Sequence, residues 1–127
     1  MRGSERLLYA GTIIAGVALV VIGIRFFAVP LTATRFFGLT ERPQGTELHT
    51  VIALRDIWLG VLALALLVLR EWRALALWFA FGTCVCLCDA VLVFQSTGKL
   101  HAIGFHVISG LACGLLAAGC WKRQLEI

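Results

Sequence analysis

Four long apolar runs, separated by short polar stretches, dominate the pattern of hydrophobic and polar positions along the chain. They cover residues 7–29, 48–69, 74–94 and 102–121. At a rise of ~1.5 Å per residue, each is long enough for one helix to cross the hydrocarbon core of a bilayer. Lone strands are excluded there, because lipid offers their backbone groups no hydrogen-bond partner. The pattern predicts an all-α protein in which residues 1–127 form one membrane domain, a bundle of four transmembrane helices.

The segment between the first and second runs predicts a short additional helix. Pro30 ends or kinks the first spanning helix, because proline cannot continue its hydrogen bonds. Residues 31–37 can then form a short helix in the headgroup layer, with Phe36 and Phe37 dipped into the lipid. Gly38 is placed to end that helix in the left-handed conformation. We therefore expect an interfacial helix between the first and second spans.

Composition strengthens the membrane assignment. Of the 127 residues, 61% are hydrophobic and only 14% are charged, which is too little polar surface for a soluble domain of this size. The lipid bilayer is thus the first expected partner. The net charge of +4 does not indicate nucleic acid, because the basic residues stand singly or in pairs at the ends of the apolar runs.

The basic residues also predict the orientation of the chain. Three belong to the first and third loops: Arg35, Arg42 and Lys99. Six lie on the side shared by the second loop and the two termini: Arg2, Arg6, Arg70, Arg73, Lys122 and Arg123. Since short cytoplasmic segments carry more Lys and Arg, we expect a multi-pass protein with both termini in the cytoplasm.

The cysteines give no sign of a metal centre. All five lie within apolar runs, and three of them form the closely spaced motif Cys84-Val85-Cys86-Leu87-Cys88. On a helix Cys86 points away from Cys84 and Cys88, and no histidine or CxxC motif accompanies them. We interpret the cysteines as small residues that fill helix contacts, and we expect neither a metal nor a cofactor.

Five ionisable residues interrupt the apolar runs at a common depth. They are Arg25, Arg55, Asp56, Asp89 and His106, each about 6–12 Å from the outer end of its predicted helix. The two arginines balance the two aspartates, and a neutral His106 stands beside them. Arg55 and Asp56 are adjacent, hence about 100° apart on their helix, and we expect each to find its partner on another helix.

This polar layer has two interpretations. Two ion pairs and a hydrogen-bonded histidine can lock four helices in register. Alternatively, the layer lines a polar pocket open to the outer face, because ionisable residues inside membranes are usually functional. We favour the pocket slightly, since five groups exceed what the locking of a small bundle requires.

An ordered set of short motifs runs along nearly the whole chain: Gly23-Ile24-Arg25, Pro30, Phe37-Gly38-Leu39, Arg55-Asp56-Ile57 with Gly60, Asp89-Ala90, and His106 after Ile103-Gly104. In these motifs the chain resembles an uncharacterised, domain-of-unknown-function family of small four-helix integral membrane proteins that is loosely DoxX-like. Cys88 and Ala53 stand where that family usually has glycine, and both remain small. The resemblance implies a four-helix membrane bundle and brings no established activity.

Three functions are compatible with the polar layer. In the first, the protein is a binding or accessory membrane protein for a small amphipathic or anionic ligand, or for a partner subunit. Arg25 and Arg55 would contact the anion, and Asp56 and Asp89 would orient them.

In the second, the protein is a membrane enzyme of the isomerase or cyclase type, acting on a lipophilic substrate. Asp56 or Asp89 would be the acid and His106 the base. In the third, it is a small proton-coupled transporter, although Arg25 is the only charge within the first span. Whether the chain is an enzyme stays open, as does a homo-oligomer formed through the motif Gly110-Leu111-Ala112-Cys113-Gly114.

Overall fold

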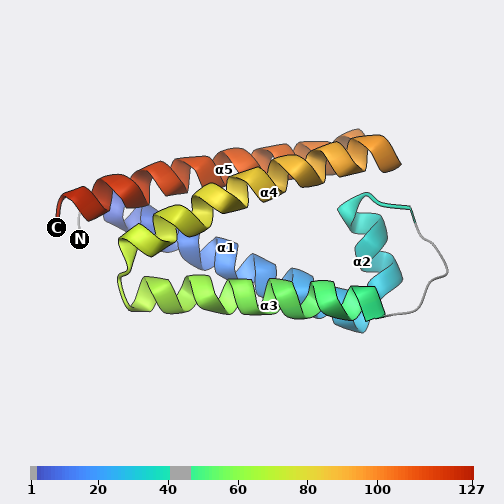
Figure 1. Cartoon of the computed structure of the whole chain (residues 1–127), viewed down its shortest axis with the longest axis horizontal. Helices are drawn as coiled ribbons and strands as arrows, with labels where there is room; N and C mark the ends of the chain where they lie inside the picture. The colour runs from blue at the N-terminus through green and yellow to red at the C-terminus, as the bar shows by residue number, and fades with distance from the viewer. Residues whose placement is uncertain (1–2, 41–46) are drawn as a thin grey trace.

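The computed structural model describes residues 3–40 and 47–127, and these residues form helices joined by short connections (Figure 1). The elements are α1 (Gly3–Ala28), α2 (Pro30–Phe37), α3 (Glu47–Val68), α4 (Trp72–Ser96) and α5 (Leu100–Leu125). All except α2 are long and apolar enough to cross a membrane. The predicted all-α bundle with four spans and a short extra helix is therefore confirmed. The ends of the spanning helices differ from the predicted runs by one to four residues.

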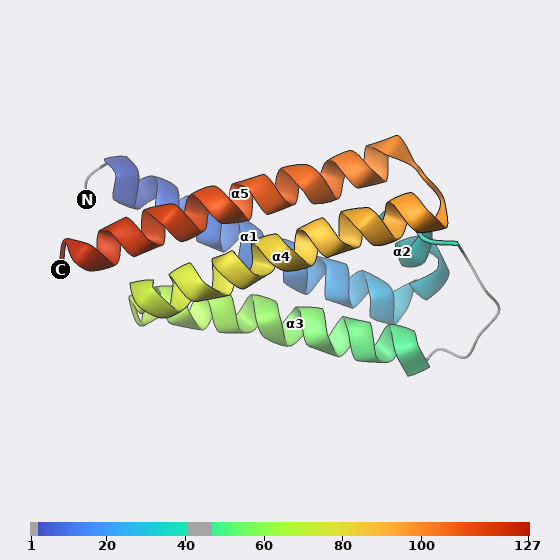
Figure 2. The ribbon, with the colours of Figure 1, turned by 45° about the horizontal axis from the view of Figure 1, so that its top comes forward.

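The long helices associate as two pairs. Helix α1 packs along α3, and α4 packs along α5, whereas the α1–α5 and α3–α4 contacts between the pairs are lighter. Both termini lie at one end of the bundle, and α2 lies at the opposite end (Figures 1 and 2). We call these the termini end and the α2 end.

Glycines allow α1 and α3 to approach closely. A Cβ atom on Gly60 would lie 2.5 Å from the carbonyl oxygen of Gly16, and one on Gly23 would lie 2.6 Å from that of Ala53. Because lipid competes equally for apolar side chains, such backbone proximity is a main source of helix association in membranes. The two glycines of α1 therefore mark its face toward α3.

The small-residue motif of α5 packs against α4. A Cβ atom on Gly110 would lie 3.3 Å from the Cβ of Cys86, and one on Gly114 would lie 3.7 Å from the Thr83 hydroxyl oxygen. Cys86 faces α5 while Cys84 and Cys88 are exposed, as the helical spacing predicts. The motif thus serves contacts within the bundle.

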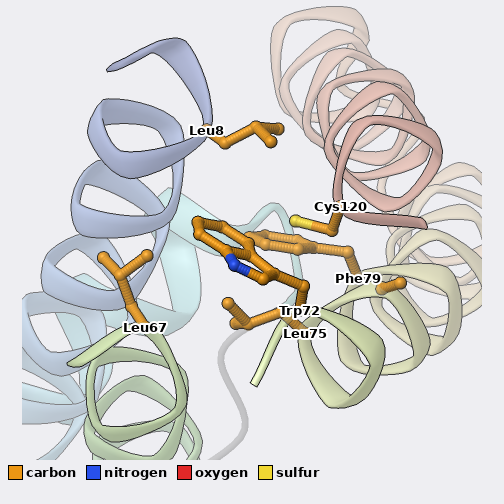
Figure 3. Packing of buried hydrophobic residues seen from close by; sticks show 7 residues of the cluster. Leu8, Leu67, Trp72, Leu75, Phe79 and Cys120 are labelled. Atoms are coloured by element: carbon orange, nitrogen blue, oxygen red, sulfur yellow. The ribbon is translucent and has the colours of Figure 1, made fainter. Parts of the chain in front are cut away.

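An apolar cluster at the termini end joins all four long helices. It contains Leu8, Leu67, Trp72, Leu75, Ala76, Phe79 and Cys120, and Trp72 lies in its middle (Figure 3). The ring of Tyr9 meets that of Trp72 edge-to-face, with centroids 5.4 Å apart. This cluster holds the two helix pairs together away from the polar layer.

Helix α2 closes the other end of the bundle. Gly38 ends it with φ = 102°, and its N–H bonds to the carbonyls of Thr34 and Arg35. The left-handed cap is thus confirmed. A Cβ atom on Gly38 would lie 2.7 Å from both the Ala102 Cβ and the Val93 Cγ1, so only glycine brings the end of α2 against α4 and α5.

The expectation that both phenylalanines of α2 enter lipid is only half right. Phe36 is 57% exposed. Phe37 instead turns inward, with its ring centroid 4.4 Å from that of His106 and 6.3 Å from that of Phe26. Consecutive helical residues point about 100° apart, so a helix whose Ala33 side packs on the bundle cannot expose both rings.

Candidate functional site

Four of the five predicted polar residues share one level near the α2 end. Arg55 and Asp56 follow the start of α3 by eight and nine residues, Asp89 precedes the end of α4 by seven, and His106 follows the start of α5 by six. These offsets correspond to roughly 9–14 Å along the helices. The structure therefore places polar residues of α3, α4 and α5 at one depth, while Arg25 lies nearer the end of α1.

Arg55 and Asp56 bind each other, contrary to the expectation that each finds a partner on another helix. The Nε and Nη2 atoms of Arg55 both lie 3.1 Å from Oδ1 of Asp56. The angle between neighbouring positions fixes the directions of their Cβ atoms, but the long arginine side chain bends back beyond them. The pair is asymmetric, because the Asp56 side chain is 8% exposed and that of Arg55 is 52% exposed.

His106 anchors α2 to α5. Its Nε2 atom lies 3.1 Å from the carbonyl oxygen of Phe37, and the residue is 5% exposed. A carbonyl only accepts hydrogen bonds, so Nε2 carries the proton and donates it. This bond satisfies one of the carbonyl groups that the end of a helix leaves without a partner. The Nδ1 atom is therefore the nitrogen of His106 that is left for other chemistry.

Asp89 is the carboxylate of the layer without a fixed contact. It is half-buried, and within residues 3–40 and 47–127 it makes no hydrogen bond or ion pair. His106, Arg55 and Asp56 all lie within electrostatic range of its carboxyl group. The structure thus gathers Arg55, Asp56, Asp89 and His106 into one cluster, which we call the polar cluster.

Arg25 stands apart from the polar cluster. Its guanidinium carbon lies 5.0 Å from the centre of the Phe36 ring, a cation–π arrangement between α1 and α2. No carboxylate in the described part of the chain pairs with it. The predicted balance of two arginines against two aspartates is therefore not built as two symmetric pairs.

The sequence did not reveal how many polar contacts α2 makes. The Thr34 hydroxyl donates to the carbonyl of Pro30 at 2.8 Å, so at 3.0 Å it accepts from Nε2 of His49 on α3. The Thr97 hydroxyl, beyond the end of α4, donates to the carbonyl of Gly38. These residues carry no motif, and only the position of α2 between the helix pairs brings them together.

The described residues include no group of three His, Cys, Asp or Glu side chains that could hold a metal ion. The polar cluster offers a partly exposed guanidinium on Arg55, a carboxylate without a fixed contact on Asp89, and a His106 ring whose Nε2 is hydrogen-bonded to Phe37. Their location in long apolar helices is that of a small multi-pass membrane protein.

Residues 16–121 match a family model described as a domain of unknown function, DUF4267, and the chain therefore belongs to this family. The match includes every residue of the polar cluster. Neither a curated protein nor a solved structure matches the chain significantly.

Proposed function

We propose that the protein is a binding or accessory membrane protein whose polar cluster holds a small amphipathic or anionic ligand. The observation that carries the proposal is the half-exposed guanidinium of Arg55, about 12 Å from the end of an apolar helix. An arginine that deep costs about 2.5–3.5 kcal/mol to insert. Arg55 uses only two of its five N–H donors to contact Asp56, and the remaining donors suit a phosphate or carboxylate group.

The neighbouring groups support a ligand with both an anionic head and a hydrogen-bond donor. Asp89 offers a carboxylate without a partner in the described residues. Its ionised form only accepts hydrogen bonds, so it would bind a donor group of the ligand. Arg25 lies nearer the membrane surface, where it can contact the same anion, in the role that the sequence analysis expects for it. With both termini in the cytoplasm, the ligand would enter from the opposite side. We also propose that the chain is loosely similar to DoxX-like proteins.

The test is the identification of molecules that co-purify with the chain. Mass spectrometry of the protein extracted from its membrane should find an amphipathic or anionic compound, reduced about tenfold or more in Arg55→Gln, which loses charge-assisted hydrogen bonds. Arg73→Gln is the matched control, because Arg73 is an exposed arginine at the other end of the bundle. Equal ligand content in the two variants would contradict the proposal.

Thermal unfolding separates a binding site from a structural lock. Arg55→Gln, Asp56→Asn, Asp89→Asn and His106→Ala are compared singly in detergent. If the cluster is a site, Asp89→Asn keeps the fold and loses the ligand. If all four variants lose the fold, the cluster is a lock and the proposal fails.

One observation favours the alternative of an isomerase- or cyclase-type enzyme. Asp89, which has no fixed contact among the described residues, lies within electrostatic range of His106, and Nδ1 of His106 is free to accept a proton. Asp89 would then act as the acid and His106 as the base, whereas Asp56 is held by Arg55. Conversion of a co-purified lipophilic compound by the wild type but not by Asp89→Asn would support this alternative.

A further inference from the structure

Two of the five cysteines face each other across the interface of α4 and α5, and neither takes part in the polar cluster. Cys86 points toward α5, because a Cβ atom on Gly110 would lie 3.3 Å from the Cβ of Cys86. Cys113 points toward α4, because a Cβ atom on Gly82 would lie 3.7 Å from the sulfur of Cys113. Each cysteine thus opposes a glycine that lies one helical turn from the other cysteine.

This arrangement brings two thiols together between the helices. Residues four apart on α4 and three apart on α5 share a face, so the sulfurs of Cys86 and Cys113 converge. The two thiols are close enough to interact directly, and both are free. The remaining cysteines lie elsewhere: Cys84 and Cys88 are exposed, and Cys120 is buried in the apolar cluster at the termini end.

The small residues at this interface make a disulfide between the two thiols feasible. A disulfide needs Cα atoms about 4.4–6.8 Å apart. Gly82, Gly110 and Gly114 line the contact between α4 and α5, so no bulky side chain at these positions holds the helices apart. Because the thiols already interact, we expect rotations of the two side chains to bring the sulfurs to bonding distance.

The depth of the pair determines which oxidant can reach it. Cys86 lies ten residues before the end of α4, and Cys113 lies thirteen residues after the start of α5. Both are therefore about 15 Å or more from the ends of their helices, near the middle of the hydrocarbon. A water-soluble disulfide such as oxidised glutathione does not enter this layer. It also reacts only with the thiolate, whose charge apolar surroundings disfavour.

An oxidant that suits this location dissolves in lipid and takes up protons together with electrons, because a charge left in the hydrocarbon is costly. A quinone meets both requirements. Its reaction with the pair breaks two S–H bonds and forms one S–S bond, and the two electrons and two protons convert the quinone to its quinol. Every reactant and product is neutral. Both cysteines are half-buried, so their sulfurs stay within reach of the acyl chains.

We propose that Cys86 and Cys113 form a redox-active dithiol that a lipid-soluble quinone oxidises to a disulfide. The oxidised form joins α4 covalently to α5, one turn deeper than Asp89 of the polar cluster. The reaction does not require the ligand proposed for that cluster.

Anaerobic oxidation of the full chain in lipid nanodiscs provides the test. The reduced protein is incubated with decylubiquinone or with oxidised glutathione, the remaining thiols are alkylated, and linked peptides are identified by mass spectrometry. We expect decylubiquinone to join Cys86 to Cys113 about tenfold faster than oxidised glutathione does, because exchange depends on the rare thiolate. One quinol, measured by its absorbance, should appear for each disulfide. Equal rates, no disulfide, a disulfide without quinol, or links between other cysteines in place of this one would overturn the proposal.

Matched serine variants locate the reaction. Cys86→Ser and Cys113→Ser should each form neither disulfide nor quinol with decylubiquinone. Cys84→Ser and Cys88→Ser change exposed thiols of the same helix and should react as the wild type does. Arg55→Gln, which should lose the ligand of the polar cluster, should also react as the wild type does, so the two proposals can fail separately. Equal quinol yields from Cys86→Ser and Cys84→Ser would contradict the assignment of the pair.

Discussion

Replacement of Gly60 by alanine tests how closely α1 and α3 must approach. The added methyl carbon would lie 2.5 Å from the carbonyl oxygen of Gly16 and 2.8 Å from Cγ2 of Val20. A comfortable contact between carbon and a carbonyl oxygen is about 3.3 Å, so the two helices must separate by roughly 0.8 Å. The obstacle is backbone, which cannot rotate out of the way.

The separation lowers the stability of the protein because it weakens the contacts between α1 and α3. A gap of this size forfeits about a quarter to a half of the dispersion energy at each affected contact. Overpacking of this kind typically destabilises a protein by about 1–3 kcal/mol. Alanine also has a helix propensity about 1 kcal/mol better than that of glycine, which partly hides the loss.

Gly104→Ala removes this ambiguity. Gly104 lies inside α5, and a Cβ atom there would meet nothing within 4 Å in the described structure, so this variant gains the propensity alone. Reversible unfolding in mixed micelles with an anionic detergent, followed by circular dichroism, gives both free energies. We expect Gly60→Ala to be less stable than Gly104→Ala by about 1–3 kcal/mol. Stabilities that agree within about 0.5 kcal/mol would refute the close packing of α1 on α3.

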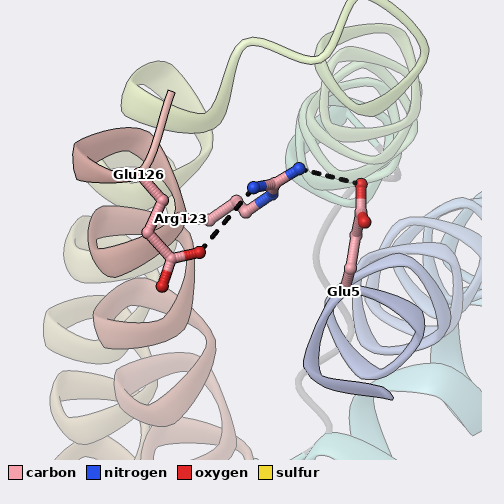
Figure 4. Close-up of polar contacts among 3 residues, drawn as sticks. All are labelled: Glu5, Arg123 and Glu126. Carbon is pink, nitrogen blue, oxygen red and sulfur yellow. Dashed lines mark hydrogen bonds and ion pairs between the residues drawn. The ribbon is translucent and has the colours of Figure 1, made fainter. Parts of the chain in front are cut away.

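Three further predictions concern polar contacts, each measured by unfolding in detergent. His106→Ala should lose about 1–3 kcal/mol, because a carbonyl at the end of α2 loses its donor, and His106→Gln should recover part of this; equal losses would contradict the capping role. Arg55→Gln should cost about 1–3 kcal/mol and more than Asp56→Asn, since it leaves the buried Asp56 carboxylate unpaired, and the double variant should be less damaged than Arg55→Gln alone; additive losses would argue against the pair. Glu5→Gln should cost about 0.5–1 kcal/mol by breaking the ion pair between Glu5 on α1 and Arg123 on α5 (Figure 4), and the loss should shrink at high salt.

The length of the apolar runs was enough to predict the helices, because spanning a bilayer imposes one length and one kind of secondary structure. Local signals were equally direct at α2, where Pro30 begins the helix and Gly38 ends it. Counting residues from the helix ends also placed Asp56, Asp89 and His106 at one level, since the rise of a helix is constant.

Partners of individual side chains could not be obtained in this way. The helical angle gives the direction of a Cβ atom, but the guanidinium of Arg55 lies several bonds beyond it and returns to Asp56. Likewise Phe37 turns inward because α2 packs between the helix pairs, and no pattern within residues 31–37 encodes that position. Such contacts depend on tertiary arrangement, which periodicity alone does not specify.

The pairing of Arg55 with Asp56 has a consequence for how the chain enters the membrane. Because the two charges belong to the same helix, α3 carries its own counterion and presents nearly no net charge in its middle. It can therefore leave the insertion machinery for the lipid before α4 and α5 have been synthesised. A cation whose partner lay on α4 would instead cost α3 about 2.5–3.5 kcal/mol until α4 had been inserted. The adjacent pair thus separates the insertion of α3 from the assembly of the finished bundle.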